Sequence, residues 1–97
     1  MARFLIEVDH EAEAGACART VKVFLSTGSH YLTHADWGCG DGVHSAWLIV
    51  DVDTREQALA ILPPADRARA RIVALNRFGL DEVDRFLVHH RGARTAA

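Results

Sequence analysis

The pattern of apolar and polar residues predicts four β-strands, in which successive side chains point to opposite faces. In the first strand Phe4, Ile6 and Val8 share one face, while Glu7 points to the other. Three glycines in residues 38–42 predict a turn that joins the second and third strands as a hairpin. The predicted strands are residues 3–8, 30–37, 44–52 and 71–78.

Other stretches repeat apolar residues three and four positions apart, the spacing of an amphipathic helix. One helix is predicted to end at about Thr27, with Gly28 just beyond it. Thr54 and Gln57 have the spacing of a capping box and predict the start of a second helix. Pro63 ends that helix because proline cannot continue the backbone hydrogen bonds. A short helix after the last strand is predicted from Leu80, Val83, Phe86 and Leu87.

The predicted order of strand, helix, strand, strand, helix, strand is the βαββαβ order of the ferredoxin-like fold. We therefore predict one α+β domain over residues 1–88, with an antiparallel four-stranded sheet and both helices on one sheet face. Residues 89–97 lack periodicity and are predicted to form a flexible C-terminal tail.

The third and fourth predicted strands are apolar on both faces. In the third strand Leu48 and Val50 lie on one face, and Trp47 and Ile49 lie on the other. An uncovered apolar sheet face is a strong association surface. We therefore expect a homodimer in which the open sheet faces of two chains meet and form a dimeric α+β barrel.

Composition narrows the classes of partner. The 97-residue chain has a net charge of −2 with neutral histidines, which gives no electrostatic case for binding nucleic acid or an anionic membrane. No apolar run approaches the roughly 20 residues that span a bilayer. We expect no signal peptide, because Glu7 and Asp9 fall in the first strand. The two cysteines do not suggest a disulfide framework, so the cytoplasm is the expected compartment.

Four segments together carry a family resemblance that covers about residues 3–79: ARFLIEV, HADWGCGDGVHSAWLIVDVDT, EQALAILPP and RIVALNRF. With these segments the chain resembles the small dimeric α+β-barrel proteins, which include muconolactone-isomerase-like proteins, YciI-like proteins and antibiotic-biosynthesis-type monooxygenases. The resemblance implies the ferredoxin-like fold and a dimer. It also implies either a transition metal held by His and Cys or an organic ligand between sheet and helices. No catalytic motif of a characterised branch maps onto the chain.

The predicted hairpin carries the residues with candidate metal chemistry. If the turn is centred on Cys39, His34 lies directly opposite His44, with Cβ atoms roughly 4.5–5.5 Å apart. Asp36 shares the face of His34, and Cys39 lies at the tip. Two imidazoles, a carboxylate and a thiolate suit borderline metals, so we predict a Zn, Ni or Cu site formed by these four residues. A shift by one residue would send His44 to the other face.

The alternative is a metal-free enzyme of the isomerase, lyase or cofactor-independent monooxygenase kind, with no organic cofactor. His34 or His44 would act as general base, and Asp36 would orient the imidazole. Trp37 and Trp47 share a strand face opposite to His34, so this pocket and the histidines would lie on different faces. The predicted substrate-binding residues are His30, Tyr31, Trp37 and Trp47.

A third interpretation is a structural or accessory domain without an active site, in which the hairpin histidines are only surface residues.

The sequence also predicts a structural role for two residues outside the hairpin. Cys17 is expected to be a buried core thiol, because free cysteine is among the most buried residue types. His10, at the junction of the first strand and helix, is expected to be a solvated loop residue.

Overall fold

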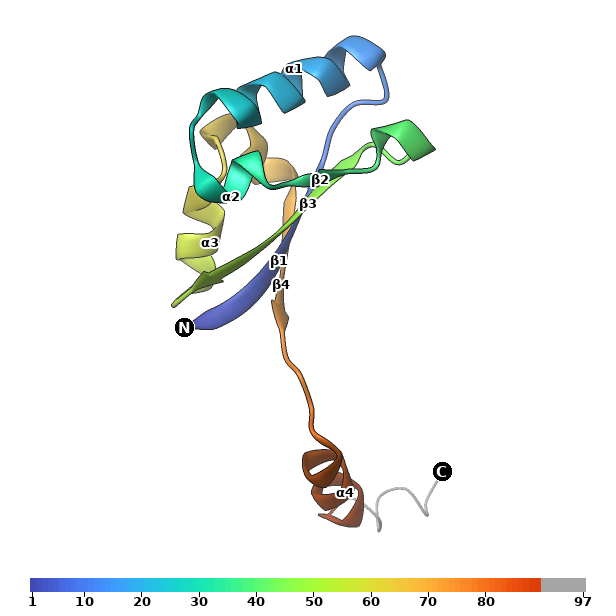
Figure 1. Cartoon of the computed structure of the whole chain (residues 1–97), viewed down its shortest axis with the longest axis vertical. Helices are drawn as coiled ribbons and strands as arrows, with labels where there is room; N and C mark the ends of the chain where they lie inside the picture. Colours follow the sequence, from blue (N-terminus) through green and yellow to red (C-terminus); the bar gives the residue numbers. More distant parts are fainter. Residues whose placement is uncertain (90–97) are drawn as a thin grey trace.

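The structure, a computed structural model, describes residues 1–89, so of the predicted tail only His89 is described. It is an α+β fold whose strands form one antiparallel sheet in the order β2-β3-β1-β4 (Figure 1). This order is compatible with the ferredoxin-like fold. The elements are β1 (Ala2–Asp9), α1 (Ala14–Ser26), α2 (His30–Thr33), β2 (Asp36–Trp37), η1 (Cys39–Asp41), β3 (Ser45–Val52), α3 (Arg55–Ile61), η2 (Pro64–Arg69), β4 (Ala70–Leu75) and α4 (Leu80–His89).

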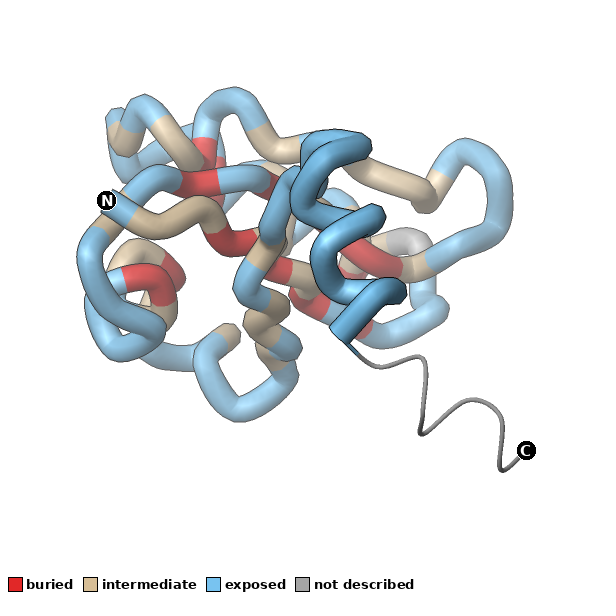
Figure 2. The backbone as a smooth tube through the Cα atoms, turned by 90° about the horizontal axis from the view of Figure 1, so that it is seen from below, coloured by how far each residue is buried: buried red, intermediate tan, exposed pale blue. Residues whose placement is uncertain are grey.

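The core lies between one face of the sheet and the helices α1, α2 and α3. Phe4, Ile6 and Val8 of β1 are buried there, as the alternation in the sequence predicts. Their partners on β3 share that face because directly opposed residues of an antiparallel pair point the same way. The other buried core residues are Phe24, Leu32, Ala46, Leu48, Val50, Ala58 and Leu62. Figure 2 shows the buried stretches of the backbone in red between exposed ones.

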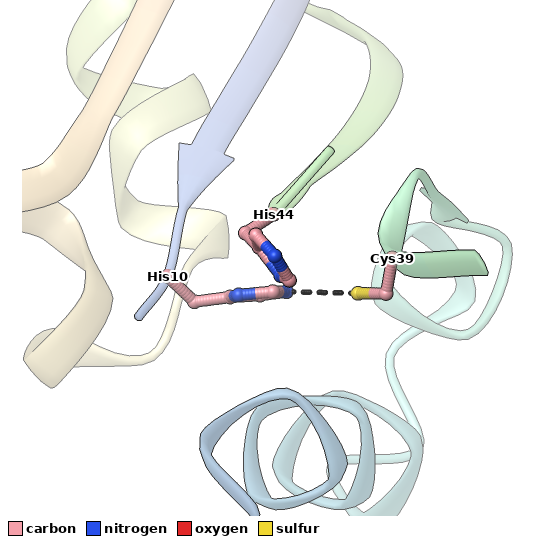
Figure 3. Close-up of side chains that lie close together, drawn as sticks. All are labelled: His10, Cys39 and His44. Atoms are coloured by element: carbon pink, nitrogen blue, oxygen red, sulfur yellow. Dashed lines mark hydrogen bonds between the residues drawn. The ribbon is translucent and has the colours of Figure 1, made fainter. Parts of the chain in front are cut away.

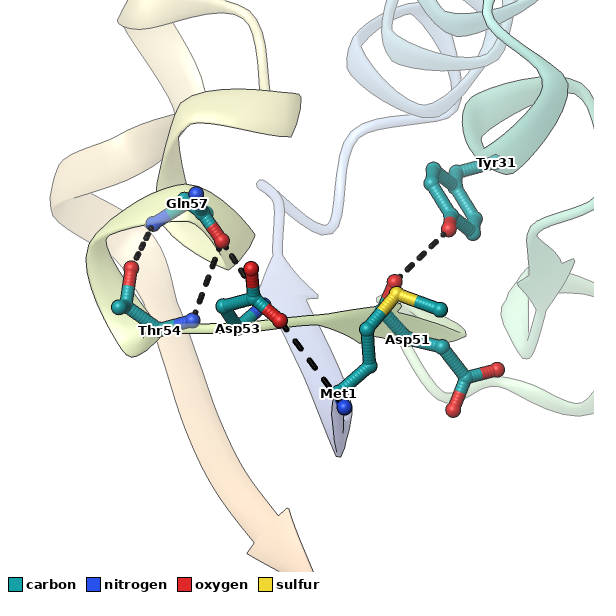
Figure 4. Close-up of polar contacts among 6 residues, drawn as sticks. All are labelled: Met1, Tyr31, Asp51, Asp53, Thr54 and Gln57. Carbon is teal, nitrogen blue, oxygen red and sulfur yellow. Dashed lines mark hydrogen bonds and ion pairs between the residues drawn. The ribbon is translucent and has the colours of Figure 1, made fainter.

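The predicted capping box is confirmed at the start of α3 (Figure 4). The backbone N–H of Gln57 donates to Oγ1 of Thr54 at 3.1 Å, and Oε1 of Gln57 accepts the backbone N–H of Thr54 at 3.2 Å. Tyr31 makes a separate hydrogen bond: its hydroxyl donates to the backbone carbonyl of Asp51 at 3.2 Å. This contact links α2 to the end of β3.

The second predicted strand is wrong over most of its length. Residues 30–33 form the short helix α2, because the hydroxyl of Ser29 accepts the backbone N–H of Leu32 at 3.3 Å and caps the helix start. The helix places Leu32 in the core, where it is 2% exposed. Only Asp36 and Trp37 pair with β3.

The opposite face of the sheet is open to solvent in part and carries apolar residues, as predicted for β3 and β4. Leu5 pairs with Ile49 on one side and with Val73 on the other, so these three form an apolar row across β3, β1 and β4. Ile49 at one end of the row is 53% exposed. The helices α1 to α3 lie on the other face, so they do not cover this row (Figure 1).

Helix α4 stands apart from the rest of the fold (Figure 1). Residues 76–79 run away from β4 and carry the helix beyond the sheet, and none of the residues of α4 is buried. The radius of gyration is 17.8 Å, whereas a compact chain of this length has about 12.5 Å. The predicted terminal helix is thus present, but as a projecting arm.

Candidate metal centre

Side chains from three separate segments meet at one end of the sheet (Figure 3). His10 follows β1, Cys39 begins η1 and His44 precedes β3. One ring nitrogen of each histidine and Sγ of Cys39 all lie within 4.8 Å of one another. His10 is 8% exposed, and the other two residues are half-buried. This cluster, His10, Cys39 and His44, has the ligand types and the spacing to hold a metal ion.

Strand pairing places the two histidines beside each other. Asp9 pairs with Ser45, at the ends of β1 and β3. One residue further, the backbone N–H of His10 donates to the carbonyl of His44 at 3.0 Å. The hydroxyl of Ser45 also donates to Oδ1 of Asp9 at 2.6 Å, which fixes the same strand ends. The positions of both imidazoles therefore follow from the sheet.

The glycine-rich turn brings Cys39 to the histidines. The backbone N–H of Gly38 donates to the carbonyl of Ser45 at 3.0 Å, and the N–H of Val43 donates to the carbonyl of Gly38 at 2.9 Å. Gly42 has a φ of 79°, in the left-handed region that favours glycine. A Cβ at Gly38 would lie 2.7 Å from the carbonyl oxygen of Val43, so this turn requires glycine there.

The hydrogen bonds of His10 determine which of its nitrogens can bind a metal. Nδ1 lies 3.2 Å from the carbonyl oxygen of Glu11, and because a carbonyl only accepts, Nδ1 carries the proton. In the neutral ring Nε2 then has a free lone pair. Nε2 lies 3.1 Å from Sγ of Cys39. A backbone carbonyl that orients a histidine in this way is the usual support of a metal-binding imidazole.

His44 has an unsatisfied polar atom. Its Nδ1 is buried and has no hydrogen-bond partner among the described residues. Leaving such an atom unpaired costs roughly 1–3 kcal/mol. The ring centroids of His10 and His44 are 5.7 Å apart, and the ring of His10 stacks on Trp37 at 5.9 Å. A bound ion or a proton donor at this place would therefore lower the cost of burying His44.

Cys17 lies next to the cluster. Its sulfur is at disulfide distance from that of Cys39, and the two Cα atoms are 7.1 Å apart. The expectation of a buried core thiol is therefore wrong, because Cys17 is half-buried and its sulfur is directed at Cys39 in the turn. It lies early in α1, which places this helix start over the same end of the sheet.

A half-buried carboxyl near His10, that of Asp66, adds a negative charge when it ionises. Burial raises the pKa of Asp66, in η2, above its ordinary value of 3.8. The positive charges of Arg69 and His10 act in the opposite direction but do not cancel the effect of burial. Asp66 thus takes up a proton more readily in the folded chain than an exposed aspartate does.

The predicted pairing of His34 with His44 is wrong. Asp36 pairs with Trp47 and Trp37 with Ala46, so the register differs from that of a turn centred on Cys39. His34 is exposed at the end of α2, where its Nδ1 donates to the carbonyl of His30 at 2.7 Å. The cluster thus contains Cys39 and His44 of the four predicted ligands, and not His34 or Asp36.

The predicted aromatic pocket also does not form as expected. Because Trp37 pairs with Ala46, its ring faces the core, where it packs edge-on against Phe24 at 5.0 Å. Trp47 faces the open side, and its indole N–H donates to Oε2 of Glu7 at 3.1 Å. The two tryptophans therefore lie on opposite faces of the sheet.

Of the predicted substrate-binding residues, His30 and Tyr31 lie on α2, and Trp47 lines a cavity on the open side of the sheet. His30 is exposed on α2, its ring 4.7 Å from that of His34, and Tyr31 packs partly against the core. A cavity of about 290 Å³ brings together three of the other predicted residues, His34, Asp36 and Trp47. Its lining consists of Leu5, His34, Asp36, Trp47, Leu48 and Ile49.

His10 is the residue that the sequence interpretation missed, and its solvated loop position is wrong. The predicted strand order could have indicated His10. In a ferredoxin-like sheet the end of the first strand lies beside the start of the third, so His10 after β1 and His44 before β3 are brought together. Cys17, near the start of the helix α1 that follows β1, lies over the same end of the sheet.

Comparison with known proteins adds no further assignment: no protein family, no curated protein and no solved structure matches the chain. Within residues 1–89, no helix combines the length and the apolar character needed to cross a membrane.

Proposed function

We propose that this chain is a transition-metal-binding protein whose ion is held by His10, Cys39 and His44. Cys17 supplies a fourth ligand when both cysteines are reduced. Zinc fits this ligand set best among the predicted metals, because two thiolates and two imidazoles in a tetrahedron are typical of zinc.

The observation that carries the proposal is the convergence of three ligand atoms within 4.8 Å. In a tetrahedral zinc site a nitrogen at about 2.0 Å and a sulfur at about 2.3 Å from the ion lie about 3.5 Å apart. Nε2 of His10 and Sγ of Cys39 are 3.1 Å apart, so a small outward movement of either side chain admits the ion. The lone pair of Nε2 already faces the sulfur.

The cysteine pair supports the fourth ligand. The Cα atoms of Cys17 and Cys39 are 7.1 Å apart, whereas disulfides have Cα separations of about 4.4–6.8 Å. Two thiolates on one zinc ion lie about 3.8 Å apart in a tetrahedral site, which suits a wider Cα separation. A disulfide and a dithiolate metal site exclude each other, so oxidation of this pair would remove both sulfur ligands and leave only His10 and His44.

A site with four protein ligands is closed and serves structure rather than catalysis. Here the ligands come from the end of β1, the start of α1, the turn η1 and the start of β3. One ion would therefore hold together segments that are far apart in the sequence. Binding is expected to stabilise the fold by about 2.7 kcal/mol when free metal exceeds the dissociation constant 100-fold.

The test is native mass spectrometry of the reduced chain with one equivalent of zinc. One bound ion per chain is expected for the unaltered protein and for His34→Ala, which removes an exposed histidine outside the cluster. His10→Ala and His44→Ala are expected to weaken binding by at least about 100-fold, since loss of a mere outer-shell partner already costs 10–100-fold. Equal binding by all four proteins would overturn the proposal.

The cavity on the open side favours a second candidate, a metal-free small-molecule site. His34 would act there as general base, with Asp36 and Trp47 beside the ligand, since all three line the same cavity. Calorimetric titration with small aromatic acids and lactones would detect such a ligand. Binding that is lost in His34→Ala and kept in His10→Ala supports this candidate; no binding of either compound class counts against it.

A further inference from the structure

The open sheet face and the projecting helix α4 are two apolar surfaces of one chain that do not cover each other. Leu5, Ile49 and Val73 form the row on the sheet. On α4, Leu80 is 76% exposed and Val83 and Leu87 are 38% and 39% exposed, and their spacing of three and four places them on one side of the helix. Each surface requires a cover that the same chain does not supply in this conformation.

We propose that a second copy of this chain covers both surfaces. In a reciprocal dimer, α4 of each chain packs across the open sheet face of the other, with the apolar side of the helix on the row of Leu5, Ile49 and Val73. This exchange is isologous, because every chain gives one arm and receives one. It does not depend on the metal site, which lies at the strand ends.

The arm favours a second chain over intrachain packing. The longest dimension of the molecule is 54 Å, against 29 and 22 Å for the others, and residues 76–79 direct α4 away from its own sheet (Figure 1). A ten-residue helix alone is marginally stable in water, since isolated helices shorter than about 12–15 residues rarely persist. Packing against another surface would stabilise α4.

The size of the contact suffices for a dimer. Phe78, which precedes α4, is 73% exposed, and a phenylalanine can bury on the order of 200 Å². An arm that buries on the order of 400 Å² on each side, exchanged twice, buries about 1,600 Å², which is the size of a stable interface.

The charges of the two surfaces also suit the pairing. The first turn of α4 carries Asp81 and Glu82, and Arg71 on the open face keeps a 70% exposed side chain although it forms an ion pair with Glu7 at 3.6 Å.

Sedimentation equilibrium of the full chain and three variants tests the exchange. The unaltered chain is expected to have twice its 10.7 kDa mass. Ile49→Asp on the sheet and Val83→Asp on the arm are each expected to give monomers. Val23→Asp is the matched control, because Val23 is 46% exposed on α1, outside the proposed contact. A monomeric unaltered chain, or a dimer that survives Val83→Asp, would overturn the proposal.

Photo-crosslinking keeps the test decisive if an aspartate variant fails to fold. Benzoylphenylalanine is placed at position 87, and isotope-labelled chains are mixed with unlabelled ones before irradiation. Crosslinks from position 87 to β1 or β3 that join a labelled to an unlabelled chain support the exchange. Crosslinks confined to one chain would show that α4 folds back on its own sheet and would overturn it.

Discussion

Nε2 of His10 lies 3.1 Å from Sγ of Cys39, although 29 positions separate the two residues in the sequence. The contact depends on the pairing of β1 with β3 and on the turn that returns Cys39 to the strand ends. Neither the hairpin nor the first strand could form it alone. The candidate metal centre is therefore a property of the folded sheet, and metal binding and folding should be coupled.

Cys17→Ser tests the contribution of the fourth ligand. The variant keeps His10, Cys39 and His44 but loses one thiolate, so zinc affinity should fall by about 100-fold or more. Competition against a chromophoric chelator measures this change in the reduced protein. The unaltered chain after oxidation should bind zinc more weakly still than the variant, because both sulfurs are then in a disulfide and only the two imidazoles remain as ligands. Undiminished affinity of the oxidised chain would contradict the role of the thiolates.

Gly38→Ala tests the turn that positions Cys39. An added Cβ would lie 2.7 Å from the carbonyl oxygen of Val43 and 2.8 Å from the ring of Trp47. Overpacking of this kind costs about 1–3 kcal/mol of unfolding free energy. Gly40→Ala is the control, because a Cβ there meets nothing within 4 Å. Urea denaturation measures both variants, and equal stability of the two would contradict the close approach at Gly38.

Asp66→Asn tests the half-buried carboxyl of η2. Burial raises the pKa of Asp66 above 3.8. Between pH 3.8 and the raised pKa, this carboxyl therefore holds more protons in the folded chain than in the unfolded chain. Stability due to this group is therefore full at low pH and is lost as pH rises through the raised pKa. The asparagine variant, which stays neutral, should have the higher urea midpoint at pH 7. The difference should shrink as pH falls toward 3.8, and a difference that grows would contradict the assignment.

Much of the fold follows from local patterns. The alternation of Phe4, Ile6 and Val8 and the capping box of Thr54 and Gln57 are sufficient to predict β1 and the start of α3, because burial and capping act over short distances. The segment at His30 was not predictable in the same way. Its weak alternation resembles a strand, but the cap from Ser29 and the burial of Leu32 favour a turn of helix.

The candidate site was predictable only in part. Cys39 and His44 were identified from residue type, but their partner His10 is supplied by strand pairing rather than by the hairpin. The two-residue strand β2 allows a register that no glycine pattern specifies, and this register separates His34 from His44. A shift of register alters every cross-strand neighbour, which is why spacing within one hairpin could not determine the ligand set.

X-ray absorption spectroscopy of the reduced, zinc-loaded chain tests the central claim most directly. The account predicts two sulfur ligands at about 2.3 Å and two nitrogen ligands at about 2.0 Å from the ion. In His44→Ala one nitrogen contribution should be replaced or the bound zinc lost. A spectrum with only nitrogen and oxygen ligands, unchanged by His44→Ala, would mean that the ion binds elsewhere and would contradict the proposed centre.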